Sequence, residues 1–166
     1  MKGAVAILMV AALVALSLPA EAGVPTEQLK GATDQVLRIL QDPEMRKPDK
    51  VEARRQQIRT VANEIFDWQE TAKRALAQHW QQRTPQQREE FSKLFADLIE
   101  RAYVGKLERY NGERIVYAGD AVEGDQATVK TKLMTKTSTE VPIDYRMLKE
   151  GERWRAYDVT IEGVSL

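Results

Sequence analysis

Residues able to do covalent or acid–base chemistry are scarce in this chain of 166 residues. It has no cysteine and a single histidine, His79, next to Trp80. A zinc site at His79 would have only carboxylates as further ligands, which is an uncommon set. We therefore interpret His79 as an imidazole on a helix surface or partly packed beside Trp80, and we expect no metal and no cofactor.

Nucleophilic catalysis finds equally little support. A Ser–His–Asp triad would have to combine His79 with Ser92, Ser138 or Ser165, and none of these serines lies in a G-x-S-x-G sequence. The chain also lacks a glycine-rich phosphate-binding loop. We predict that the protein is not an enzyme. Its many carboxylates leave one alternative open, a small α+β hydrolase with a carboxylate pair in a cleft.

Large apolar residues, by contrast, recur at regular spacing. Between Phe91 and Tyr110 they return every three or four positions, which predicts one wide apolar stripe on a long helix. The sequence T-P-Q-Q from Thr84 is typical of a helix start with a capping box. A preceding helix is expected from about Asp67, its N-cap, to about Gln81. The stripe requires an apolar surface opposite it.

Helices are predicted to come first in the chain and strands second. Two further helices are expected over residues 26–41 and 48–65, and strands over residues 114–118, 126–135, 141–149 and 153–162. Gly119-Asp120 is typical of a turn, and the alternation slips between Trp154 and Tyr157, which indicates a bulge or a strand buried on both faces. This order predicts an α+β fold in which the N-terminal helices pack on one face of a four-stranded antiparallel meander.

The apolar faces carry more large side chains than a small core needs. One interpretation is a filled core; the other is that sheet and helices stand apart and enclose an apolar pocket. For the second interpretation we predict a wall that includes Phe95, Leu98, Tyr103, Val129, Leu133, Ile143, Tyr145, Met147 and Val159.

The first residues have the pattern of a secretory signal peptide. Lys2 precedes an uncharged apolar run from Ala4 to Leu18, and A-E-A at residues 20–22 follows Pro19. A membrane anchor is the competing interpretation, but a spanning helix needs about 20 apolar residues. We expect cleavage after Ala22, a signal peptide over residues 1–22 and a single domain over residues 23–166. The formal net charge is zero, which argues against nucleic-acid binding.

Two groups of residues carry a resemblance to a known family. The first comprises residues 66–68 (FDW), 77–80 (AQHW), 84–88 (TPQQR) and Phe91; the second comprises residues 154–159 (WRAYDV) and 162–166 (EGVSL). Together they resemble the MlaC and toluene-tolerance family of periplasmic phospholipid-binding proteins. Members usually continue into a further helix after the second group, so we expect either a truncated sequence or a short member.

The resemblance implies a periplasmic carrier with a bound phospholipid as cargo. It would move lipid between an inner-membrane ABC lipid transporter complex with an MCE-type subunit and an outer-membrane lipoprotein–porin complex, and so maintain outer-membrane lipid asymmetry. A monomer is expected. Besides the hydrolase, two alternatives remain, namely a carrier of another apolar lipid such as a hopanoid and an adaptor with a fully packed core.

A basic surface patch is the last expectation. Lys130, Lys132 and Arg146 fall on the strand phase opposite the predicted pocket, with Lys136 in the following turn. They are either a solvated, edge-protecting face or a docking patch for an acidic partner or for anionic head groups.

Overall fold

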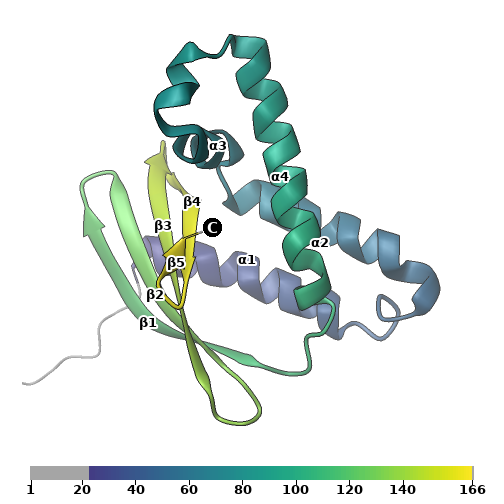
Figure 1. Cartoon of the computed structure of the whole chain (residues 1–166). Coiled ribbons are helices and arrows are strands. Elements are labelled where there is room, and N and C mark those ends of the chain that lie inside the picture. Colours follow the sequence, from purple (N-terminus) through teal and green to yellow (C-terminus); the bar gives the residue numbers. More distant parts are fainter. Residues whose placement is uncertain (1–22, 166) are drawn as a thin grey trace, which may run out of the picture.

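The computed structural model describes residues 23–165, and it places the helices before the sheet (Figure 1). The helical elements are α1 (Val24–Gln41), η1 (Pro48–Lys50), α2 (Val51–Ile65), α3 (Trp68–Leu76), η2 (Ala77–Gln82) and α4 (Pro85–Leu107), where η1 and η2 are 3-10 helices. The strands are β1 (Arg114–Glu123), β2 (Gln126–Met134), β3 (Glu140–Glu150), β4 (Arg153–Ile161) and β5 (Val164–Ser165). The predicted fold class is confirmed.

The sheet is an antiparallel meander in the order β1-β2-β3-β4-β5, so it has five strands rather than the predicted four. The extra strand is short. Glu162 and Gly163 both adopt positive φ, 50° and 84°, which turns the chain sharply and pairs Thr160 with Ser165. A strand of two residues is too short to show an alternation of apolar and polar side chains, so the sequence pattern did not predict β5.

The predicted turn at Gly119-Asp120 is wrong, because β1 continues through it to Glu123. The register between β1 and β2 shifts between Tyr117 and Gly119, and Gly119 has a φ of +102°. A glycine at positive φ is the residue that such a β-bulge requires. Beyond the bulge Asp120 lies opposite Val129, whose side chain packs against α1 residue Leu29. The bulge therefore aims Asp120 at the helical layer.

The predicted irregularity in the last long strand is confirmed as a bulge. Arg146 pairs with Asp158 but the next residue of β3, Met147, pairs with Ala156, so Tyr157 is the additional residue of β4. Both Ala156 and Tyr157 are buried as a result. Strand β4 also contacts the helical layer beside this bulge, since the Asp67 amide donates to the Ala156 carbonyl at 2.8 Å.

The helix predicted from Asp67 to Gln81 ends earlier, at Leu76. Asp67 is its N-cap as predicted and accepts a hydrogen bond from the Glu70 amide at 2.9 Å. Ala77 then adopts a φ of 47°, which stops the α-helix, and the chain continues as η2. Within η2, Trp80 is buried and has the Arg88 guanidinium 5.3 Å from its ring centre.

The start of α4 follows the sequence prediction in detail. The Thr84 hydroxyl accepts from the Gln87 amide at 3.2 Å, and the Gln87 side chain accepts from the Thr84 amide at 3.0 Å. These two bonds form the capping box, with Pro85 in the first turn. These hydrogen bonds fix the first residue of α4 and hence which of its later residues face the rest of the protein.

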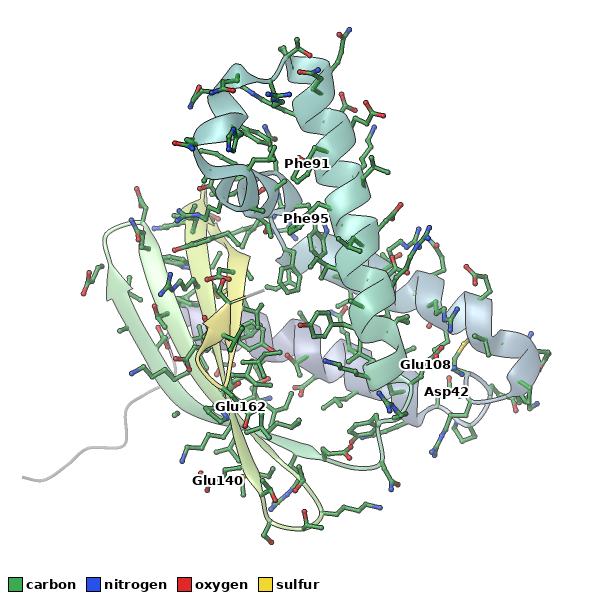
Figure 2. All side chains as sticks on the ribbon, viewed as in Figure 1. Asp42, Phe91, Phe95, Glu108, Glu140 and Glu162 are labelled. Atoms are coloured by element: carbon green, nitrogen blue, oxygen red, sulfur yellow. The ribbon has the colours of Figure 1, made fainter. Side chains whose placement is uncertain are left out.

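Helices cover one face of the sheet (Figure 1). Helix α1 contacts β1, β2 and β4, whereas α2 and α3 contact β4, and α4 packs on α3. Phe91 and Phe95 stack at 5.6 Å on the side of α4 toward α3 and the sheet (Figure 2). The closely packed core lies between α1 and the sheet; it consists of Leu29, Ala127, Val129, Met147, Trp154 and Ala156.

Candidate functional site

A cavity of about 920 Å³ lies between the sheet and helices α1, α2 and α4. Ligand pockets in proteins commonly measure roughly 300–1,000 Å³, so this one is near the upper end. Its wall is mainly aliphatic and aromatic, and it includes Leu37 and Leu40 from α1 and Ile58 and Ile65 from α2. An apolar wall of this extent suits a ligand with a long hydrocarbon part.

The cavity exists because the two central strands are packed over only part of their length. In β2, Val129 is 0% exposed in the core, whereas Leu133 is half-buried and lines the cavity. In β3, Met147 is 0% exposed in the core, whereas Ile143 lines the cavity. Tyr145 lies between the packed and open parts of β3, packed against the core and lining the cavity.

Tyrosines form part of this wall. Tyr103, Tyr110, Tyr145 and Tyr157 all line the cavity. Burial raises the pKa of Tyr145 to about 12, with a smaller contribution from nearby Tyr117. A tyrosine is neutral at physiological pH already, and this shift extends its neutral range to more alkaline pH.

Five of the nine predicted wall residues line the cavity: Tyr103, Leu133, Ile143, Tyr145 and Val159. The other four lie elsewhere. Val129 and Met147 are in the packed core, Phe95 stacks on Phe91, and the Leu98 side chain points outward with 60% of its surface exposed. Contact of any of the nine residues with a ligand stays a prediction.

The wall residues that the sequence analysis did not assign come largely from α1 and α2. They include Val36, Leu37, Leu40, Ile58 and Ile65, joined by Ile115, Val141 and Ile161 from the strands. The helical periodicity did place the α1 and α2 residues on a buried side. It could not indicate that this side faces an open space rather than packed side chains.

Charged residues close the seam between α2 and α4. Glu108 receives Arg55 Nε at 2.9 Å and Arg54 Nη2 at 3.2 Å, and Arg59 Nε lies 2.7 Å from Glu100. The Arg55 hydrogen bond, assisted by Arg54, lowers the pKa of Glu108 against the opposing effect of burial. Arg55, Arg59 and Glu100 also line the cavity, so the seam is part of its rim.

Two other cations reach the cavity from the end of α4. Lys106, in the last turn of α4, and Arg109, just after the helix, are exposed and line the cavity. Neither pairs with a carboxylate among residues 23–165. Lys106 Nζ lies 4.6 Å from the centre of the Tyr103 ring, and Arg109 Nε donates to the Gly105 carbonyl at 3.1 Å. These two side chains add positive charge to this part of the rim.

Over residues 23–165, no three or more His, Asp or Glu side chains gather in a way that could hold a metal ion. His79 is exposed on η2. No helix within that range is long and apolar enough to span a bilayer.

The fold and the cavity together define a class of protein that encloses an apolar ligand between an antiparallel sheet and a helical layer. The model of the family described as MlaC protein matches residues 30–166. The chain belongs to this family. Among solved structures, it is similar to a phospholipid-binding protein from Ralstonia solanacearum in complex with a phospholipid, with a TM-score of 0.72 and 27% identity over 84% of this chain and 78% of that chain.

The packed and open parts of the sheet predict unequal costs of truncation. Met147→Ala removes a fully buried side chain and should lower the free energy of unfolding by about 2–5 kcal/mol. Leu133→Ala enlarges a space that is already open, so its loss in ligand-free protein should be clearly smaller. Urea unfolding of both variants measures the difference, and equal losses would contradict the division of the strand.

The seam between α2 and α4 predicts a pH dependence. Because the pKa of Glu108 is lowered in the folded protein, its stabilising effect is present above its ordinary pKa, about 4.3, and is lost as the pH falls through the folded value. Wild-type protein should therefore be more stable than Glu108→Gln at pH 7, and this advantage should shrink toward pH 3.

Urea midpoints across this pH range are the measurement for the seam. Glu89→Gln serves as the matched control, since the Glu89–Lys93 pair is exposed and lies within α4. Exposed i,i+4 pairs contribute little, so this variant should change stability only slightly at any pH. An advantage over Glu108→Gln that is the same at pH 3 and pH 7 would show that the seam charges do not stabilise the fold.

Proposed function

We propose that the protein is a phospholipid carrier that holds acyl chains in the cavity between its sheet and helices. The observation that carries this proposal is the cavity of about 920 Å³ with its apolar wall. It is supported by membership of the MlaC family and by the likeness to a protein solved with a phospholipid. A binding and transport role, rather than catalysis, fits both findings.

The physical need for such a carrier follows from the hydrophobic effect. Each methylene group moved from an apolar environment into water costs about 0.8 kcal/mol, so two acyl chains cannot cross an aqueous space unaided at a useful rate. A protein that shields the chains lowers this cost by enclosure alone. It requires a stable empty space and an opening, and no reactive side chain.

The cellular role is a finer part of the same proposal. We infer that the carrier works as a monomer in the periplasm and passes lipid between an inner-membrane ABC transporter complex, with its MCE-type subunit, and an outer-membrane lipoprotein–porin complex. Maintenance of outer-membrane lipid asymmetry would be the result. Family membership and the signal-peptide pattern, which lies outside the described residues, support this role.

The expected basic docking patch on the outer face of the sheet is interrupted by carboxylates. Lys132 pairs with Glu140 at 2.6 Å, Arg146 lies 3.7 Å from Asp158, and Lys136 donates to the Asn111 side chain. A surface in which cations alternate with carboxylates produces a weak field, and steering of a partner depends on the summed field. We therefore do not assign docking to this face.

The free cations at the end of α4 suit the other end of the cargo. A phospholipid whose chains lie in the cavity leaves its phosphate at the rim, where Lys106 and Arg109 have no carboxylate partner among residues 23–165. Arginine and lysine form charge-assisted hydrogen bonds to phosphate oxygens. We propose that these two residues contact the phosphate.

Occupation of the cavity is tested by filling it. Leu133→Trp projects a larger side chain into the open part and should reduce the phospholipid that co-purifies by roughly half or more, with the fold retained. Native mass spectrometry with lipid extraction gives the ratio of lipid to protein. Lys130→Trp is the control, since Lys130 is exposed on the opposite face of the same strand. Unchanged lipid content in a folded Leu133→Trp protein would refute acyl-chain binding at this site.

The phosphate contact is tested by removing the rim charges. The double variant Lys106→Gln, Arg109→Gln should retain phosphatidylglycerol about fivefold less well than wild type and diacylglycerol with the same chains equally well. The control Arg101→Gln, Lys130→Gln removes two exposed charges that do not line the cavity. A similar loss for both lipids, or for the control, would contradict phosphate recognition by the rim.

A further inference from the structure

The beginning of α1 is held by a carboxylate from strand β1, that of Asp120. The backbone nitrogen of Gly23 donates to Asp120 Oδ1 at 2.9 Å, across 97 residues. The Thr26 hydroxyl donates to the same oxygen at 2.5 Å. Gly23 is the N-cap of α1 and has no side chain to cap the helix, and Asp120 instead binds the Gly23 nitrogen and the Thr26 hydroxyl.

Several features of the sequence serve this contact. The bulge at Gly119 turns Asp120 toward the helical layer, where it lies opposite Val129. Thr26 is only 1% exposed. A Cβ atom at position 23 would overlap the Asp120 carboxylate, so no residue other than glycine fits there without a shift. The carboxylate and the nitrogen are thus placed by both β1 and α1.

Within the described part of the chain, no neighbouring cation balances the charge of Asp120. Its contacts are the Gly23 nitrogen and the Thr26 hydroxyl, and within residues 23–165 it forms no ion pair with a lysine or arginine. The helix N-terminus supplies only partial positive charge. A half-buried carboxylate of this kind gains most from a full positive charge at the position of the Gly23 nitrogen.

We propose that Gly23 is the first residue of the mature protein and that its freed ammonium group forms an ion pair with Asp120. In the cleavage, water hydrolyses the Ala22–Gly23 peptide bond. The hydroxyl goes to the Ala22 carboxyl group, and the Gly23 nitrogen gains hydrogen and is protonated at neutral pH. The neutral amide that donates one hydrogen bond becomes an ammonium group with three donors and a positive charge.

The ion pair has a consequence for the cavity. Helix α1 supplies one of its walls, through residues such as Val36 and Leu40. A positive charge at a helix N-terminus is unfavourable on its own, and Asp120 reverses that effect while it attaches the helix to β1. Removal of the leader thus strengthens the attachment of a wall of the binding site.

The ion pair is tested with four proteins, each of which contains residues 23–166. Two begin at Gly23 and two carry one additional serine before it, which moves the ammonium group away; each start is made with Asp120 and with Asp120→Asn. The chain that begins at Gly23 should unfold at a higher urea concentration than the extended chain, and Asp120→Asn should abolish the difference. Equal stability of the two starts with Asp120 present would overturn the proposal.

A second measurement reports the ammonium group directly. The α-amino group of the Gly23 chain should react about tenfold more slowly with an acylating reagent near pH 7 than that of the Asp120→Asn variant, because the ion pair holds it protonated above its ordinary pKa of roughly 7.7–8.0. Equal reaction rates would overturn the ion pair. Neither measurement involves lipid, so the result is independent of the proposed carrier function.

Processing itself is read from the full chain exported with its own leader. Mass analysis of the purified product should give an N-terminus at Gly23. Any other first residue, or an intact Met1 in a membrane fraction, would overturn the assignment of the cleavage site.

Discussion

An apolar space of about 920 Å³ must be kept open against the tendency of apolar side chains to collapse together. The remaining features of the fold depend on this constraint. The lining residues gain less from burial than core residues do, so stability must come from elsewhere. It comes from the packed part of the sheet around Val129 and Met147, from the buried Trp154, and from polar contacts that Asp67, Thr84 and Asp120 make at the helix starts.

Local signals in the sequence predicted much of this fold. The capping box at Thr84 and the N-cap at Asp67 each depend on residues within one helical turn, so their outcome is decided locally. The bulge at Tyr157 was visible because the alternation on both sides of it is strong. The early end of α3 at Ala77 could not be predicted, since alanine favours helix and nothing in the neighbouring residues indicates a positive φ there.

The site was less predictable than the fold for a different reason. Val129 and Leu133 share one face of one strand and the same alternation, yet one is in a packed core and the other faces a void. The difference depends on where α1 and α4 lie over the sheet, which no spacing within β2 records. The same limit applies to charged residues. The ion pair between Lys132 and Glu140 depends on the register of β2 against β3, which the sequence alone does not give.

The seam between α2 and α4 is joined by arginines and glutamates rather than by interlocking apolar side chains, and this affects what happens when it separates. Water solvates a released guanidinium or carboxylate readily, so a parted seam would present a wettable edge. An edge built of leucines would instead adhere to other opened molecules. A charged seam around an apolar cavity would let α2 and α4 separate and come together again in a crowded solution without causing aggregation.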